Sequence, residues 1–399
     1  MRKHVQKILS AQRDLLSPQA TQAVEASLAD LRKVIQQNSP RKDVENQMGE
    51  LEKTANKWLK PYPYGGLREN IEVFLVAIAV AMAVRTFFLQ PFKIPTGSMQ
   101  PTLFGITSDP DFSRSEAFHD DLKPTEDFDI SNPAARFFRF WQRGVQYKYE
   151  IAKNDGGITA WEENPKKFLL FNLRQRFFLG EEKVPYTVWF PPDNLLKRAG
   201  LLNYWGQPNP KVFKKGDVIF KIKVHSGDHL FVDRFTYNFR RPKRGEIIVF
   251  ETRGIDGLPQ DQYYIKRLIG LGGETLQIGN DRHLVINRTN HLDKTTPHFE
   301  HVYSFDPKRP PEDSKFSGHL NQYVANQFNL GNLAQRFPNE QAQFTVTPDR
   351  YLVMGDNTVN SLDSRTWGDF PRANVIGKSF FVYWPFGNSR GTRPGVSDD

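Results

Sequence analysis

Residues 228–250, DHLFVDRFTYNFRRPKRGEIIVF, are the clearest indication of architecture in this chain. Their apolar and aromatic runs predict two β-strands, and the basic segment RRPKRG between them predicts a turn. Residues 263–270, YYIKRLIG, predict another strand, which ends at the glycine-rich turn of residues 270–274. A strand is expected after this turn, so its glycines do not form a dinucleotide-binding fingerprint, which needs a helix there. This part of the chain is therefore predicted to be mainly β.

Two further segments contain candidate functional residues. Residues 351–354, YLVM, predict a strand that runs into GDNTVNSLDSRTWG at residues 355–368. Far upstream, residues 93–103 read KIPTGSMQPTL, in which Ser98 follows a glycine that permits a tight turn and precedes the stiffening Pro101. The tetrapeptide TGSM is by itself a weak signal, because most such serines only serve turns.

Immediately before this serine lies an apolar segment, residues 73–92, VFLVAIAVAMAVRTFFLQPF, whose only charge is Arg85. Twenty residues of helix are about 30 Å long, which is enough to cross a bilayer core. Arg85 disfavours a span, but it is off-centre and its side chain can extend toward one surface. A buried core helix is the alternative, and it is disfavoured because residues 73–84 are apolar on all sides. We expect a transmembrane anchor at residues 69–90.

The flanking charges predict how this anchor is oriented. Lys57, Lys60 and Arg68 precede the apolar segment. Positive charge near a span favours the cytoplasmic side, so residues 1–70 are expected in the cytoplasm and the rest of the chain outside it.

Residues 1–68 are predicted to form a helical hairpin followed by a linker. Ser17-Pro18 is typical of a helix start, apolar residues follow at helical spacing, and Asn38-Ser39-Pro40 interrupts the pattern. The hairpin either self-associates or shields its own apolar stripe. No apolar run typical of a cleavable signal peptide occurs in residues 1–60.

The serine segment, the strand pair, the Lys-Arg strand and the final GDN-xx-NS-x-DSR-x-WG segment follow one another behind a membrane anchor. In this order they resemble the motif boxes of bacterial type I signal peptidase (leader peptidase), over residues 70–105 and 226–385. The final segment is the most specific of the four. The resemblance implies an antiparallel, coiled β-sheet catalytic domain formed by residues 91–105 and 226–386. Insertions are then expected at residues 106–225, where the family has a short connection, and at residues 281–345, with a flexible tail at residues 387–399.

The resemblance also implies a Ser–Lys dyad, with Ser98 as nucleophile and Lys266 as general base. A lysine is a base only when neutral, so its pKa must fall from about 10.4 toward 7–8 through burial. Thr96 and the Ser98 N–H would form the oxyanion hole, and Ser361 would orient the lysine. Supporting roles fall to Asp356, Asn357, Asp363 and Arg365, and the candidate substrate-cleft residues are Ile94, Pro95, Met99 and Tyr264.

Composition excludes several other classes of protein. The 399 residues contain no cysteine, which removes disulfides, thiolate metal sites and cysteine nucleophiles. The histidine pairs His225/His229 and His298/His301 lack a third ligand, so no metal and no cofactor are expected. The mean hydropathy of −0.58 rules out a polytopic membrane protein. The net charge of +9 fits an anionic membrane surface better than nucleic acid, which we do not expect as a partner.

Two readings of the 106–225 insertion remain open. An acidic part, residues 109–130, precedes basic and aromatic runs such as FFRFW at 137–141 and KKFLLF at 166–171. These runs either lie on anionic lipid or form the core of a small accessory domain. The 281–345 insertion is expected to pack over the sheet.

These features predict a single-pass enzyme of the inner (cytoplasmic) membrane, with its catalytic domain outside the cytoplasm. It would cleave the signal peptides of secreted preproteins after small residues at −1 and −3, as a serine hydrolase. Its partners would be those peptides, the bilayer with its anionic surface, and the protein export machinery. The alternatives are a non-catalytic membrane-anchored interaction protein on the same fold, and a soluble self-cleaving repressor-type protease with a similar dyad.

Overall fold

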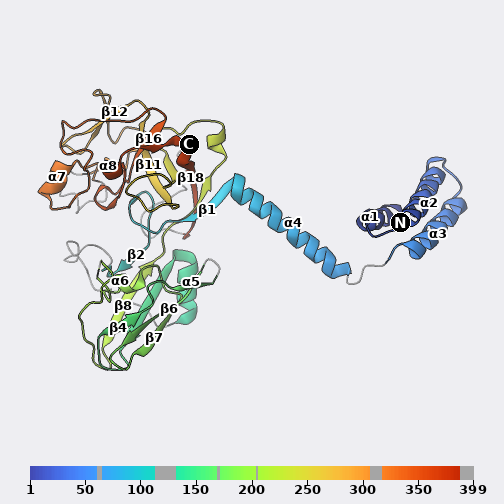
Figure 1. Ribbon diagram of the computed structural model, residues 1–399, viewed down its shortest axis with the longest axis horizontal. Coiled ribbons are helices and arrows are strands. Elements are labelled where there is room, and N and C mark those ends of the chain that lie inside the picture. The colour runs from blue at the N-terminus through green and yellow to red at the C-terminus, as the bar shows by residue number, and fades with distance from the viewer. Residues whose placement is uncertain (61–64, 113–131, 169–170, 204, 306–316, 387–399) are drawn as a thin grey trace. The chain divides into compact units, whose positions relative to one another are not determined.

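The structure, a computed structural model, describes residues 1–60, 65–112, 132–168, 171–203, 205–305 and 317–386 (Figure 1). It divides into two compact units, Met1–Ala81 and Met82–Asp399. The tail expected at 387–399 and most of the acidic stretch expected at 109–130 lie outside the described residues.

Before α4, the N-terminal unit contains the expected hairpin and one further helix. The hairpin consists of α2 (Pro18–Gln36) and α3 (Arg41–Trp58), and α1 (Arg2–Gln12), which the sequence analysis did not predict, packs with them. Ser17 Oγ accepts a hydrogen bond from the Ala20 N–H at 3.2 Å, so this residue caps α2 as expected.

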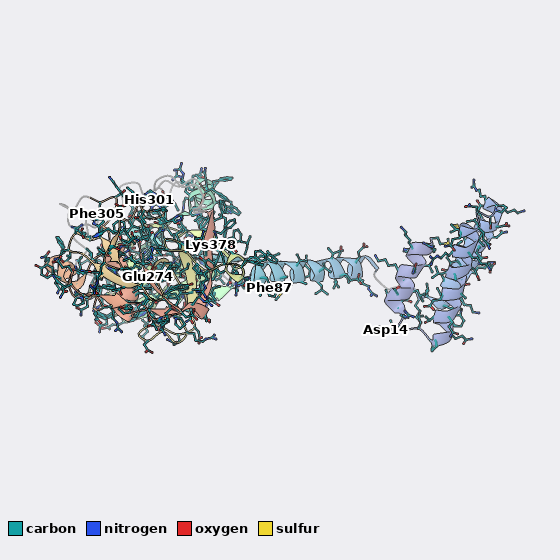
Figure 2. The ribbon with its side chains drawn as sticks, turned by 90° about the horizontal axis from the view of Figure 1, so that it is seen from above. Asp14, Phe87, Glu274, His301, Phe305 and Lys378 are labelled. Atoms are coloured by element: carbon teal, nitrogen blue, oxygen red, sulfur yellow. The ribbon has the colours of Figure 1, made fainter. Side chains whose placement is uncertain are left out.

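Helix α4 (Gly65–Phe87) is the one helix in the described residues that is long and apolar enough to cross a membrane. None of its apolar window is buried within the structure, which disfavours a soluble core helix. Figure 2 shows its side chains projecting outward along the helix as far as the labelled Phe87. The expected anchor at 69–90 was placed too far along the chain: the residues from Leu89 onward form a strand, because Pro91 cannot continue a helix.

A seven-stranded sheet forms the centre of the second unit, and every neighbouring pair of its strands is antiparallel. This confirms the mainly β, antiparallel fold class. In spatial order the strands are β1 (Leu89–Lys93), β9 (His229–Asp233), β18 (Val375–Trp384), β10 (Ile247–Glu251), β11 (Tyr263–Leu271), β16 (Arg350–Met354) and β17 (Phe370–Pro371).

The two strands expected in residues 228–250 are β9 and β10, but they do not pair with each other. Strand β18 lies between them, and the connection holds the short 3-10 helix η2 (Thr236–Asn238). The C-terminal strand therefore closes the centre of the sheet. Sequence alone does not show this, because the pairing joins segments more than 100 residues apart.

The 281–345 insertion contains regular structure and shares a core with the main sheet. Ile269 of β11 and Leu352 of β16 belong to the same buried cluster as Leu276, Phe299 and Phe337. Its strands join β12 (Thr275–Ile278), which precedes the insertion, in a four-stranded sheet. The order of this sheet is β14 (Asn290–Leu292), β13 (Leu284–Ile286), β12 and β15 (Phe344–Thr345), and the insertion also contains α7 (Gln322–Gln327). The final box holds η4 (Thr358–Asn360) and α8 (Ser364–Trp367), and η5 (Arg372–Asn374) precedes β18.

The 106–225 insertion has its own apolar core, which includes Phe177, Tyr186, Phe213 and Phe220. One sheet has the order β2 (Thr107–Asp109), β8 (Val218–His225) and β3 (Val145–Ile151). The other contains β4 (Ile158–Trp161), β6 (Phe171–Leu179), β5 (Lys166–Phe168) and β7 (Val184–Trp189), and the helices are α5 (Pro133–Arg143) and α6 (Leu195–Arg198).

This insertion leaves and re-enters the main domain at adjacent points. Thr107 of β2 pairs with His225 of β8. Next to them, the Phe104 N–H donates to Asp228 Oδ2 at 2.7 Å, and the Asp228 N–H donates to the Phe104 carbonyl at 2.8 Å. A long insertion can therefore occupy this position without separating the serine segment from β9.

Candidate active site

Ser98 lies in a compact turn that follows β1. The turn is closed by hydrogen bonds from Gln100 N–H to the Gly97 carbonyl (3.1 Å) and from Leu103 N–H to the Met99 carbonyl (2.8 Å). The Met99 and Leu103 side chains are fully buried and anchor the turn in the core. Ser98 itself is only 5% exposed, so its hydroxyl occupies a defined position.

Strand β11 brings Lys266 to this serine from 168 residues away. Lys266 Nζ lies 2.8 Å from Ser98 Oγ and 3.0 Å from the Ile265 carbonyl oxygen. Lys266 is only 4% exposed, and its Nζ stands 5.5 Å from the centre of the Tyr264 ring. The structure thus brings together the two residues that were expected to form the dyad.

Burial lowers the pKa of Lys266 to about 8. The carboxylates of Asp363 and Asp356 act in the opposite direction and favour the charged amine, whereas Arg365 adds to the lowering. A substantial fraction of this lysine is therefore neutral near pH 8 and able to accept a proton.

Ser361 lies close to the serine turn but does not bond to the lysine. A side chain at Gly355 would place its Cβ 2.3 Å from Ser361 Oγ and 2.5 Å from the Ser98 carbonyl oxygen, so only glycine allows this close approach. The hydrogen-bond partners of Lys266 Nζ are Ser98 Oγ and the Ile265 carbonyl. The orienting role expected of Ser361 remains a prediction.

Asn357 holds the backbone of the serine turn. Its N–H donates to the Ser98 carbonyl at 3.0 Å, and its Nδ2 donates to the Gly97 carbonyl at 3.1 Å. Among the residues that the structure describes, the Ser98 N–H has no hydrogen-bond acceptor, and the Thr96 side chain is exposed two residues before it. The turn therefore offers a free N–H donor beside the serine hydroxyl, with the Thr96 hydroxyl available on the same loop.

Asp356 connects three parts of the site. Arg267, the residue after Lys266, donates through Nε to Oδ1 (2.8 Å) and through Nη2 to Oδ2 (2.7 Å) of this carboxylate. Thr102, four residues after Ser98, donates its hydroxyl to the same carboxylate. The sequence analysis named Asp356 but missed Arg267 and Thr102, although each lies inside a segment quoted for the resemblance.

A second buried ion pair stabilises the final box. Arg365 donates to both carboxylate oxygens of Asp363 at 2.9 Å, and both side chains are fully buried. Burial alone would raise the pKa of Asp363, but the Arg365 charge and hydrogen bonds, including one from the Gly355 N–H, outweigh it and lower that pKa. Arg365 also donates to Thr358 Oγ1 at 2.6 Å, so this pair fixes η4 beside the dyad.

The candidate cleft residues divide into two groups. Ile94 and Met99 are buried in a core cluster with Leu230 and Val249. Their burial leaves little of either side chain on the surface, and their expected role in a substrate cleft remains a prediction. Pro95 is exposed and Tyr264 is partly exposed, so these two remain accessible near the dyad.

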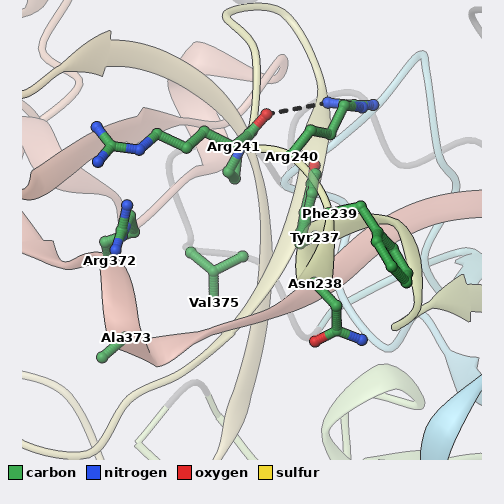
Figure 3. Close-up of a pocket in the computed structure, with 9 residues that line it drawn as sticks. Tyr237, Asn238, Phe239, Arg240, Arg241, Arg372, Ala373 and Val375 are labelled. Atoms are coloured by element: carbon green, nitrogen blue, oxygen red, sulfur yellow. Dashed lines mark hydrogen bonds between the residues drawn. The ribbon is translucent and has the colours of Figure 1, made fainter.

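Two other features lie away from the dyad. A hollow of about 350 Å³ lies between residues 237–242 and residues 372–375, lined by Tyr237, Arg241 and Arg372 among others (Figure 3). In the described part of the chain, no group of three or more His, Asp or Glu side chains is placed to hold a metal ion.

Comparison with known proteins identifies relatives of the chain from residue 67 onward. The family model described as signal peptidase, peptidase S26, matches residues 67–130 and 220–384. The chain is 31% identical over 163 residues to signal peptidase I of Leptolyngbya laminosa (40% of this chain, 61% of that protein). It is 28% identical over 159 residues to a probable signal peptidase I of Synechocystis (40% and 56%). It is 32% identical over 168 residues to signal peptidase I P of Bacillus subtilis subsp. natto (41% and 70%). The match spans about three fifths of the length of the first two relatives.

Proposed function

The chain belongs to the signal peptidase family, peptidase S26, and from this membership we propose that it is a membrane-anchored serine endopeptidase that removes signal peptides from exported preproteins. The observation that carries the proposal is the 2.8 Å approach of Lys266 Nζ to Ser98 Oγ in a buried position. A serine hydroxyl is a weak nucleophile until a nearby base accepts its proton.

The first half of the reaction uses the neutral form of Lys266. The amine accepts the Ser98 hydroxyl proton while Oγ attacks the scissile carbonyl carbon, and the carbonyl oxygen becomes an oxyanion. The Ser98 N–H and the Thr96 hydroxyl donate hydrogen bonds to this oxyanion. The tetrahedral intermediate collapses when the C–N bond breaks, and the Lys266 ammonium gives its proton to the leaving amine.

The second half of the reaction releases the signal peptide. Lys266, neutral again, accepts a proton from a water molecule that attacks the acyl carbon bound to Ser98. The second tetrahedral intermediate collapses with cleavage of the ester bond, and the proton returns to Ser98 Oγ. One lysine therefore serves as base and acid in turn.

An extended substrate suits the exposed edge of the sheet. Strand β1 is the edge strand and leads directly to the serine turn, so an added peptide strand can bond to its backbone. Pro95 and Tyr264 are the accessible side chains beside the dyad. We propose cleavage after small residues at −1 and −3.

The anchor places this chemistry near a membrane. Ser98 follows Phe87, the last residue of α4, by 11 residues, a stretch of at most about 40 Å. Lys57 and Lys60, on the N-terminal side of α4, favour a cytoplasmic N-terminus and a catalytic domain on the opposite side of the inner membrane. A preprotein threaded by the export machinery presents its cleavage site at that surface.

Neither alternative has an observation in its favour. A soluble self-cleaving repressor-type protease has no use for an unburied apolar helix such as α4. A non-catalytic interaction protein has no need of a buried lysine whose pKa falls to about 8.

The proposal is tested with the full chain in detergent and a preprotein as substrate. We expect mass spectrometry to show one cut after a small residue, and we expect Ser98→Ala and Lys266→Ala to abolish it. Ser226→Ala, a serine outside the dyad, serves as the control and should cleave normally. Undiminished cleavage by either dyad variant, with all variants folded, would refute the proposed chemistry.

A further inference from the structure

Helix α5 of the 106–225 insertion presents an aromatic face to solvent. Phe137, Phe138 and Trp141 are 58%, 68% and 57% exposed. Their spacing of one, three and four residues places all three on one side of the helix. Such large aromatic side chains are costly to leave in water as a group, so this face is a candidate contact surface.

Another side of α5 contacts the catalytic sheet. Phe140 packs edge-on against Trp384 of β18, with ring centres 5.5 Å apart, and Trp384 Nε1 donates to the Trp141 carbonyl at 2.7 Å. Gly144 caps the helix in the left-handed region (φ 64°), and a Cβ there would lie 3.0–3.2 Å from Pro385, Ser226 and Trp384. The aromatic face is therefore held in place instead of being free to fold inward.

Aromatic contacts continue from α5 along the outer face of β9 and β18. Trp384 packs on His229 with ring centres 4.8 Å apart, and Tyr383 packs on Phe231 at 4.6 Å. At the other end of β9, Phe88 stacks on Phe235 at 5.3 Å and Phe235 contacts Phe239 at 4.7 Å. Phe88 is the residue directly after α4. The aromatic residues thus extend from the end of the proposed span to the insertion.

The charge of α5 indicates what kind of partner binds this surface. Its 11 residues include Arg136, Arg139 and Arg143 and no acidic residue. Aromatic rings flanked by arginines are typical of the headgroup region of an anionic bilayer, where rings enter the interface and cations meet phosphates. A second contact with the bilayer also loses little translational entropy, because α4 already holds the domain at the membrane.

We propose that α5, together with the end of β18, is a second membrane-contact surface that lies in the headgroup region of an anionic bilayer. This proposal rests on the proposed anchoring by α4. Residues 133–143 lie outside both segments matched by the family model, whereas β18 lies inside the second, so α5 is the part of this surface that belongs to the insertion. It would fix the catalytic domain at two points and limit the orientations in which the serine turn meets a substrate.

The absence of cysteine allows a direct test. Phe138→Cys, Tyr323→Cys and Ala81→Cys are each spin-labelled in the full chain and reconstituted in nanodiscs of phosphatidylcholine and phosphatidylglycerol. Tyr323, on α7, is a half-exposed aromatic residue on a helix and is the matched control. Ala81 lies inside α4 and reports on the anchor.

We expect the ratio of relaxation by oxygen to relaxation by a water-soluble nickel complex to be highest for the label at 81, intermediate at 138 and lowest at 323. A label at 138 that behaves like the one at 323, while the label at 81 is immersed, overturns the α5 contact and leaves the anchor standing. A water-accessible label at 81 overturns both. In nanodiscs of phosphatidylcholine alone, the label at 138 should become more accessible to nickel. An unchanged depth of this label would contradict the role of anionic lipid. If the label is protected from nickel only after a protein partner is added, the membrane assignment is overturned.

Discussion

Arg267 and Asp356 form a buried ion pair through two parallel hydrogen bonds of 2.8 and 2.7 Å, directly beside Lys266. The two side chains are 3% and 0% exposed, and 89 residues separate them in the chain. The pair joins the strand that carries the lysine to the final box, and Thr102 adds the serine segment to the same carboxylate. The relative position of the dyad residues depends on this junction.

We predict that Arg267→Ala or Asp356→Ala lowers the free energy of unfolding by about 3–5 kcal/mol, because each leaves a buried charge without its partner. Thermal unfolding in detergent measures the effect. Arg253→Ala is the control, since Arg253 forms exposed ion pairs with Glu251 and Asp261 and should change the melting temperature little. The double variant Arg267→Met/Asp356→Leu should be more stable than either alanine variant. A melting temperature unchanged in both single variants would contradict the prediction.

The pH dependence of cleavage should follow the titration of Lys266. Burial lowers the pKa of this lysine to about 8, and only the neutral amine accepts the Ser98 proton. The rate should therefore rise with pH, reach half its maximum near pH 8 and then level off. Rates on a peptide substrate between about pH 6 and pH 10 measure this profile. A rate that falls over this range would exclude a lysine base.

Stability should depend on pH in the same window but for a different reason. The pKa of Lys266 is about 8 in the folded chain and near its ordinary value of 10.5 when unfolded. Below pH 8 the lysine is charged in both states, and the folded state bears the full cost of the buried charge. As pH rises from about 8 to 10.5, the unfolded state binds more protons than the folded one, so stability increases.

Lys266→Met removes the cost of burying the lysine charge. From the size of the shift in the lysine pKa, this variant should raise the free energy of unfolding at neutral pH by about 3 kcal/mol. Melting temperatures of both proteins across the pH range give the comparison. The advantage of the methionine variant should shrink as pH rises above 8 and vanish above the unfolded pKa. A difference that stays constant with pH would show that packing, not charge, is responsible.

If the Thr96 hydroxyl is part of the oxyanion hole, two substitutions of Thr96 should differ in their effect on kcat. Thr96→Val keeps the shape and removes the hydroxyl, so kcat should fall by about 10²–10³ with little change in KM. Thr96→Ser keeps the donor and should retain most of the activity. Thr96 is exposed, so neither change should affect the melting temperature. Equal kcat values for the valine and serine variants would remove Thr96 from the reaction.

The sequence predicted the features that depend on local pattern. Ser17 caps α2 as its position before a proline indicated, and the apolar run around Val80 forms α4. The dyad could be named because Ser98 and Lys266 each lie inside a specific motif. The structure then showed them in contact, which no spacing along the chain reveals.

Features that depend on distant packing were beyond the sequence. Met99 directly follows the candidate nucleophile, and the sequence does not show that its side chain is fully buried in the core. Strand β18 enters between β9 and β10 because its apolar residues complete a sheet whose partners are far away in the chain. Helix α1 has only Val5 and Leu9 as buried apolar residues, too few to give a clear periodic pattern.

The serine turn depends on a close approach that only glycine permits. A Cβ on Gly105 would lie 2.2 Å from both the carbonyl carbon and oxygen of Thr96 and 2.8 Å from the Gly97 nitrogen. These are backbone atoms, which cannot turn aside as the end of a side chain can. Gly105→Ala must therefore displace the loop that carries Thr96 and leads into Ser98.

We expect Gly105→Ala to lower kcat by about 10²-fold, because a displacement of about 1 Å at a reacting group has an effect of that size. The free energy of unfolding should fall by about 1–3 kcal/mol through overpacking. Gly49→Ala is the matched control: no atom lies within 4 Å of its added Cβ, and alanine is the better residue inside α3. Its kcat should equal that of the wild type, with equal or higher stability. Wild-type kcat in Gly105→Ala would mean that the dyad does not depend on the position of this turn.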